Sequence, residues 1–179
     1  MPVDILLICG SLRTGSTNAA ALRCAQEVAP AGCQVVDYQD LAALPHFNPD
    51  DDVQPLAPVV AQLRSQIGQA GALLFCTPEY AGALPGSLKN LLDWTIGGGE
   101  MSGKRVGWIN SSDRGAAGAY AELATVLGYA DTVMVAEACR HIPVSRSEVA
   151  ADGSVSNPDI RQQLAAVVGA LWADRIYRE

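Results

Sequence analysis

Five short apolar runs, separated by segments of helical spacing, constrain the fold of this chain more than any other feature. The third run, residues 72–76, is unbroken in apolar character, which is typical of a strand buried on both faces of a parallel sheet. Regular alternation of strand and helix predicts such a sheet, with right-handed crossovers and helices on both faces. The expected strands are 5–9, 33–38, 72–76, 105–110 and 132–136, and the expected helices are 16–28, 59–67, 87–94, 117–127 and 159–177.

Two segments stand outside this alternation. Residues 39–57 contain three prolines and an acidic triplet, and we expect a surface loop there that is long enough to serve a site or an interface. A solvated loop without such a role is the alternative. Residues 138–155 are expected to form a loop or hairpin excursion before the last helix, with Asn157 as its N-cap and Pro158 as its first residue.

Length, composition and charge narrow the class of protein. The chain has 179 residues, a mass of 18.7 kDa and 49% hydrophobic residues, so we expect a single α/β domain over residues 1–179. The net charge of −7 and the pI near 4.7 offer no general attraction for nucleic acid or an acidic membrane surface. We therefore expect neither as a partner, and any anionic ligand must be held locally.

Residues 10–18 form a loop of small and hydroxyl-bearing residues with one arginine, Arg13, directly after the first strand. The Ala-rich segment behind the loop predicts a helix that begins at Ser16 or Thr17. The N–H groups of a first helical turn have no partners within the helix and favour an anion, so this loop can cradle a phosphate. An ordinary loop that is capped by Ser16 or Thr17 and binds nothing is the alternative.

Polar or Gly/Pro-bearing loops follow the first, third and fourth strands, at residues 10–18, 77–86 and 111–115. In parallel sheets of this kind, ligands lie outside the carboxyl ends of the strands, where the strand order reverses. The sequence therefore predicts a binding site at this edge of the sheet, built from three distant parts of the chain.

Two motifs resemble those of the NADPH-dependent FMN reductase family, the flavodoxin-like quinone, azo-dye and metal-ion reductases. Residues 10–18, GSLRTGSTN, are similar to the family pattern G-S-x-R-x-x-S-x-N. Residues 78–94, PEYAGALPGSLKNLLDW, are similar to P-E-Y-N-x-x-x-P-G-x-L-K-N-x-x-D-W. The resemblance implies a flavodoxin-like three-layer α/β/α fold with a five-stranded parallel sheet of order 2-1-3-4-5.

The resemblance also implies a function and a set of site residues. An FMN-dependent oxidoreductase would pass electrons from NADPH or NADH to a small-molecule acceptor, which could be quinone-like, a flavin, an azo compound or a metal ion. Hydride chemistry belongs to the flavin, so no catalytic side chain is expected. By the resemblance, the FMN phosphate is bound by Ser11, Arg13, Ser16, Thr17 and Asn18, the ring is wrapped by Pro78, Glu79, Tyr80, Ala81 and Gly82, and the ring's other side is bordered by residues 111–118, including Ser111 and Gly115.

This chain departs from the family pattern at two places. Ala81 stands where the family usually has Asn, which removes a side-chain anchor from the ring loop. Residues 115–118, GAAG, replace the paired glycines that are common in the family.

Cysteine usage and the start of the chain bear on compartment and metal binding. The five cysteines form no C-x-x-C pair and have no His at metal spacing, so we expect reduced core thiols and no metal site. Without a basic segment or an apolar stretch of membrane length, the expected location is the cytoplasm. The family resemblance implies a homodimer or a homotetramer, with the flavin near the subunit interface.

Three other functions remain as alternatives. A flavodoxin-type electron carrier would share the fold and FMN, but its phosphate loop usually lacks arginine and its ring is bracketed by aromatic residues from two loops. A low-molecular-weight phosphatase needs Arg six residues after its cysteine, whereas Gly15 stands six residues after Cys9. A dinucleotide-binding Rossmann module needs G-x-G-x-x-G, which residues 10–15 do not contain.

Overall fold

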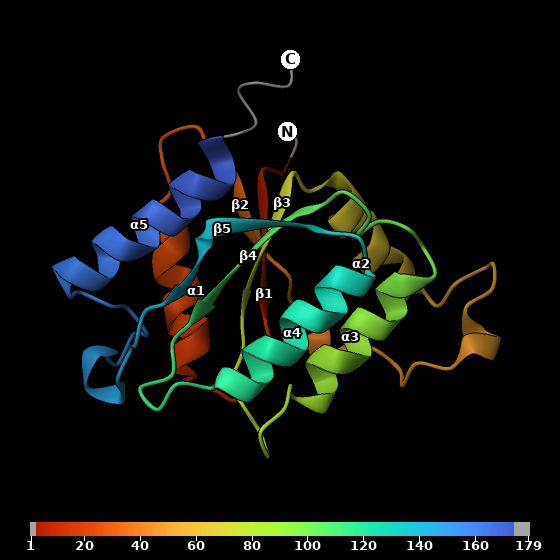
Figure 1. The fold of residues 1–179 in the computed structure, drawn as a ribbon, viewed down its shortest axis with the longest axis horizontal. Helices are drawn as coiled ribbons and strands as arrows, with labels where there is room; N and C mark the ends of the chain where they lie inside the picture. Colours follow the sequence, from red (N-terminus) through yellow and green to blue (C-terminus); the bar gives the residue numbers. More distant parts are fainter. Residues whose placement is uncertain (1–2, 174–179) are drawn as a thin grey trace.

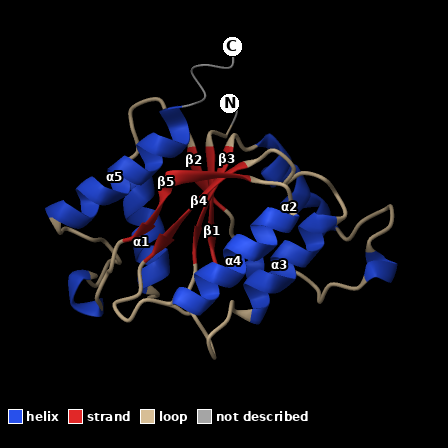
Figure 2. Cartoon of the chain, viewed as in Figure 1, coloured by secondary structure: helices blue, strands red, loops and turns tan. Residues whose placement is uncertain are grey.

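A five-stranded parallel sheet with helices on both faces forms the centre of the molecule (Figures 1 and 2). The structure is a computed structural model and describes residues 3–173. The strand order β2-β1-β3-β4-β5 is that of the flavodoxin-like fold and confirms the order implied by the family resemblance. The strands are β1 (Ile5–Cys9), β2 (Val35–Asp37), β3 (Ala72–Cys76), β4 (Arg105–Asn110) and β5 (Val133–His141), and the helices are α1 (Thr17–Glu27), α2 (Pro58–Gln69), α3 (Gly86–Ile96), α4 (Ala117–Tyr129) and α5 (Pro158–Ala173).

The two central strands, β1 and β3, pair in register from Ile5 opposite Ala72 to Cys9 opposite Cys76. All five residues of β3 are buried, as the unbroken apolar run predicts for a strand covered on both faces. Helix α1 leads from β1 to β2 on one side of β1, and the chain then crosses to β3 on the other side. The strand order therefore reverses between β1 and β3. The site is therefore expected beyond Cys9 and Cys76.

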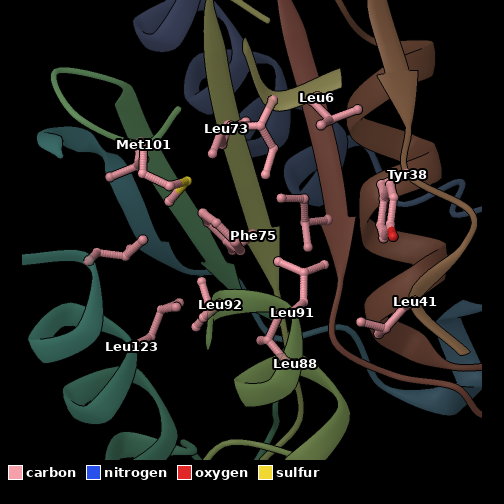
Figure 3. Packing of buried hydrophobic residues seen from close by; sticks show 14 of the residues in the cluster. Leu6, Tyr38, Leu41, Leu73, Phe75, Leu88, Leu91, Leu92, Met101 and Leu123 are labelled. Carbon is pink, nitrogen blue, oxygen red and sulfur yellow. The ribbon is translucent and has the colours of Figure 1, made fainter. Parts of the chain in front are cut away.

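Separate apolar cores lie on the two faces of the sheet. One core joins the sheet to α1 and α5 through residues such as Leu22 and Leu164. The other joins it to α2, α3 and α4, and Figure 3 shows Phe75 of β3 next to Leu91 and Leu92 of α3, with Leu123 of α4 on the same side of the sheet. The helical spacing read from the sequence thus places one apolar stripe of each helix on the sheet.

Strand β5 is longer than predicted, since it runs to His141 where the sequence indicated an end near residue 136. Val106 pairs with Met134 but Trp108 pairs with Cys139, so residues 135–138 bulge opposite Gly107. A side chain at Gly107 would lie 2.7 Å from the Ala138 Cβ atom, so the glycine makes room for the bulge. The strand is at the sheet edge and exposes its polar residues, which resembled a loop in the sequence.

The predicted excursion at 138–155 is accordingly shorter and begins after His141. It contains a 3₁₀ turn, η3 (Arg146–Glu148), and an antiparallel bridge between Val149 and Val155, so its hairpin character is confirmed. Asn157 caps α5 by accepting a hydrogen bond from the Asp159 N–H at 3.0 Å, as predicted. Positions 174–177 of the predicted last helix lie outside the described residues.

The long segment 39–57 packs against α3, and none of its residues lines the hollow described below. It contains two short 3₁₀ turns, η1 (Leu41–Ala43) and η2 (Pro49–Asp51). The Trp94 indole and the Asn90 amide both donate to the Pro45 carbonyl at 2.8 Å. Among helices within residues 3–173, none is long and apolar enough to cross a membrane.

Candidate functional site

A hollow of about 890 Å³ opens at the carboxyl ends of β1, β3 and β4. Its volume is typical of a site for a ligand of drug or cofactor size. Three of the twelve predicted site residues, Ala81, Gly82 and Gly115, are not part of its lining. The nine predicted residues that do line it are Ser11, Arg13, Ser16, Thr17, Asn18, Pro78, Glu79, Tyr80 and Ser111.

The loop at residues 10–18 presents an open set of hydrogen-bond donors. Ser16 is the N-cap of α1, and its hydroxyl oxygen accepts from the Asn18 N–H at 3.2 Å. Within residues 3–173, the N–H groups of Gly15, Ser16 and Thr17 have no hydrogen-bond partner. Among the described residues, the guanidinium of Arg13 bonds only to the Gly15 carbonyl, at 3.4 Å, and no acidic residue occupies the first turn of α1. These free donors at the positive end of a helix fit a phosphate group.

Asn18 and Ser111 are both almost fully buried and join this loop to the neighbouring strand ends. The Ser111 hydroxyl donates to Asn18 Oδ1 at 3.0 Å, and the Cys76 thiol donates to the same oxygen at 3.3 Å. Burial raises the pKa of Cys76 to about 12, so its thiol stays protonated and can donate this bond. Asn18 and Ser111 therefore hold the loop in position, in addition to lining the hollow.

Residues 80–83 form a tight turn in the predicted ring loop. The Tyr80 N–H donates to the Ala83 carbonyl at 3.0 Å, and the Ala83 N–H donates to the Tyr80 carbonyl at 3.1 Å. The two central residues, Ala81 and Gly82, have φ values of 53° and 78°. Two positive φ angles in a two-residue connection are the mark of a type I′ turn, which strongly prefers Asn-Gly. The Asn of the family pattern thus suits this backbone, and Ala81 carries conformational strain.

We predict that Ala81→Asn stabilises the protein by about 1 kcal/mol, since Asn tolerates the left-handed conformation that strains alanine. Urea unfolding of the two proteins measures the difference. Gly82→Ala, which introduces the same strain at the next position, serves as the control and should destabilise. An Ala81→Asn variant no more stable than the parent would contradict this account of the turn.

Two carboxylates clamp the ring loop to α4. The Glu79 carboxylate accepts from the Ala119 N–H at 2.9 Å, and the Glu122 carboxylate accepts from the Leu84 N–H at 2.7 Å. Helix α4 has no capping side chain of its own, because its N-cap is Ala116 with a φ of 66°. Glu79 therefore supplies the cap from a distant part of the chain. Its carboxylate is therefore engaged by the start of the helix.

The loop after β4 is fixed by its own hydrogen bonds. Asn110 Oδ1 accepts from the Ser112 N–H at 3.1 Å, and the Asn110 amide donates to the Gly115 carbonyl. The His141 ring bonds to the Ser112 carbonyl at 2.7 Å. Gly115, with a φ of 108°, contributes a backbone conformation that favours glycine and does not contribute a surface to the hollow.

One stretch of the lining was missed in the sequence, namely residues 144–147 between β5 and α5. It contributes Ser145, Arg146 and Ser147, which lie at the carboxyl end of a strand like the three predicted loops. This Ser-Arg-Ser run is polar like the other site loops, but the predicted strand ends at residue 136, so the run did not stand out as a loop at a strand end. The five cysteines are free thiols, and no group of three or more His, Cys, Asp or Glu within residues 3–173 could hold a metal ion.

Comparison with known proteins agrees with this geometry. A 2-hydroxy-1,4-benzoquinone reductase from a Burkholderia species is 32% identical over 169 residues, which are 92% of this chain and 91% of that protein. An NAD(P)H-dependent FMN reductase from Pseudomonas aeruginosa is 42% identical over 92 residues, 51% of this chain. The chain spans about half the length of that protein and of several other curated relatives it matches.

A solved structure and a family model extend the comparison along the chain. FerB from Paracoccus denitrificans, described as a flavoenzyme NAD(P)H:(acceptor) oxidoreductase, has a TM-score of 0.81 and 30% identity, with 96% of each chain covered. The model of the NADPH-dependent FMN reductases matches residues 3–145, which include both motifs and β1 to β5. The chain belongs to the NADPH-dependent FMN reductase family.

Proposed function

We propose that this chain is an FMN-dependent NAD(P)H oxidoreductase that passes electrons to a small acceptor of quinone type. The observation that carries the proposal is one hollow lined both by the open phosphate-type donors of residues 11–18 and by the clamped loop that begins at Pro78. The benzoquinone reductase relative, which is covered almost end to end, supports a quinone-like acceptor.

In this proposal the chain's residues bind and orient the cofactor. Ser11, Arg13, Thr17 and the free N–H groups at the start of α1 would hold the FMN phosphate, and the backbone of residues 78–82 would lie along the ring. Bound FMN would supply the chemistry, by accepting hydride from a nicotinamide and reducing the acceptor. Since the reaction depends on stacking and orientation, the contribution of the protein is a fixed ring loop and not a proton donor.

A flavodoxin-type carrier is the second candidate, and the lining of the hollow argues against it. Among the described lining residues, Tyr80 is the sole aromatic side chain, and the loop after β4 contributes none. A ring bracketed by aromatic residues from two loops is therefore not expected. Turnover separates the two functions, because an electron carrier does not by itself oxidise NADPH continuously in the presence of a quinone.

We predict that the purified protein binds FMN, seen as a perturbed visible flavin spectrum on titration, and then oxidises NADPH steadily with benzoquinone. Arg13→Ala should weaken FMN binding by about 1.5–3 kcal/mol, the range for a hydrogen bond to a charged group. Arg140→Ala, which removes an exposed arginine of β5 outside the hollow, is the control for net charge. Absence of flavin binding at micromolar FMN would overturn the proposal.

We further propose that residues 1–179 act as one FMN-binding domain, in the cytoplasm, as a homodimer or homotetramer. One continuous sheet with a core on each face supports the single domain. Tyr129, which is 86% exposed, and the exposed Val133 and Met134 of the edge strand support an interface between subunits.

A further inference from the structure

Three arginines, Arg13, Arg114 and Arg146, line the same hollow although they come from three different loops. This concentration of positive charge occurs on a chain of net charge −7. Two carboxylates, Glu79 and Asp113, also line the hollow, and that of Glu79 is engaged by the Ala119 N–H. One phosphate at the start of α1 accounts for Arg13, so the other two arginines need a separate explanation.

Arg114 sits on a fixed backbone and has a free side chain. Its N–H donates to the Ser112 hydroxyl at 3.2 Å, and the carbonyl of Ser112 is bonded to the ring of His141. Within residues 3–173, the Arg114 guanidinium has no hydrogen bond or ion pair. The loop therefore presents this positive charge at the hollow, next to the carboxylate of Asp113 but without an ion pair to it.

Arg146 is presented in the same manner by the segment that follows β5. It is the first residue of η3, whose capping box joins Ser145 and Glu148. Glu148 accepts from the Ser145 N–H at 3.0 Å and from the Asn157 amide at 2.8 Å, so the turn is fixed at both ends. No partner for the Arg146 guanidinium occurs among the residues that the structure describes.

We propose that Arg114 and Arg146 bind the 2′-phosphate of NADPH and thereby make the enzyme select NADPH over NADH. This inference rests on the proposed function and deepens it. The two dinucleotides differ only in that phosphate, and paired guanidinium groups are the side chains that best recognise a phosphate through directed, charge-assisted hydrogen bonds. A neutral quinone has no negative charge for these arginines to pair with. The pyrophosphate occurs in both dinucleotides, so binding it would give no selectivity between them.

The test uses the protein saturated with FMN and two probes, adenosine 2′,5′-bisphosphate and adenosine 5′-monophosphate, titrated by calorimetry. The bisphosphate should bind at least ~10-fold more tightly, and Arg114→Gln and Arg146→Gln should each remove most of that difference. The ratio of kcat/KM for NADPH to that for NADH should fall ~10-fold in each variant. Arg140→Gln, which removes one exposed arginine outside the hollow, should leave both ratios unchanged.

The outcomes separate the two proposals. Equal binding of the two probes by the wild-type holoprotein, or variants with unchanged ratios, would overturn the role of the two arginines. Weaker FMN binding in Arg114→Gln or Arg146→Gln would also overturn it, because the residue would then serve the flavin phosphate. Failure of the proposed function would appear earlier, as absence of a bound flavin spectrum. Far-UV circular dichroism checks that each variant is folded. Arg114→Lys and Arg146→Lys keep the charge and should retain part of the selectivity.

Discussion

Replacing Gly10 with alanine is expected to destabilise the protein by about 2–3 kcal/mol, the upper part of the range for overpacking a core. The added Cβ atom would lie 2.3 Å from the Thr77 hydroxyl oxygen and 2.7 Å from its Cβ atom. Thr77 is buried and branched at Cβ, so a change of rotamer moves the oxygen but leaves the Cβ contact. The ends of β1 and β3 would have to separate, at the point where the Gly10 N–H donates to the Cys76 carbonyl.

Urea unfolding of the wild type and Gly10→Ala gives the loss directly. Thr77→Gly removes the two closest clashing atoms and leaves only Leu88 Cδ2, the end of a flexible side chain, at 2.9 Å. The double variant Gly10→Ala/Thr77→Gly should therefore be more stable than the sum of the two single changes predicts. Simple additivity of the two changes would show that the contact between these strand ends is not the cause. Because Gly10 begins the proposed phosphate loop, FMN affinity should fall together with stability.

The second large effect is expected from Gly118→Ala, at the start of α4. An added Cβ atom there would lie 2.2 Å from the Gly82 carbonyl oxygen and 3.0 Å from a carboxylate oxygen of Glu79. The close contact is with backbone, so the turn at residues 80–83 must move away from the helix. We expect a loss of about 2–3 kcal/mol in stability, through overpacking and the weakened bond between Glu79 and the Ala119 N–H.

Helix α4 itself supplies the matched control. Gly128 lies in the same helix, and apart from its chain neighbours and the nearby backbone of that helix no atom lies within 4 Å of its added Cβ position. Gly128→Ala should therefore stabilise the protein by about 0.5–1 kcal/mol. Thermal unfolding and FMN titration are measured for both variants. Gly118→Ala should lower FMN affinity by displacing the ring loop, while Gly128→Ala should not. If Gly118→Ala lowers the free energy of unfolding and Gly128→Ala raises it, the contact between α4 and the ring loop is the cause of the loss.

Much of the fold could be predicted because its signals are local. Buried strands such as β1 and β3 are short apolar runs, and the helices between them carry apolar residues at helical spacing. The alternation of strand and helix can therefore be predicted without knowing which strands pair. The predicted end of β5 is wrong by five residues, because an edge strand with a bulge exposes polar residues such as Glu137 and Arg140. Its pairing depends on β4, which no local pattern reports.

The candidate site divides in the same way. Its loops could be located because each follows a strand. The structure brings side chains from all three to one hollow, namely Ser11, Arg13, residues 16–18, residues 78–80 and Ser111. What the sequence did not reveal are the contacts between distant segments. Glu79 caps a helix that begins 38 positions later, and Asn18 is bonded to a serine 93 positions away. Such partners are chosen by the packing of whole elements, so they become visible only in the folded chain.

The contacts that hold the ring loop in place do not involve the side chain that the loop presents to the hollow. Glu79 and Glu122 fix the loop at its two ends, while backbone bonds between Tyr80 and Ala83 close the turn. None of these bonds uses the side chain of Tyr80, which remains 55% exposed at the hollow. Substitutions at position 80 are therefore expected to leave the framework of the loop intact, and this is the position at which the proposed acceptor specificity can be varied by mutation.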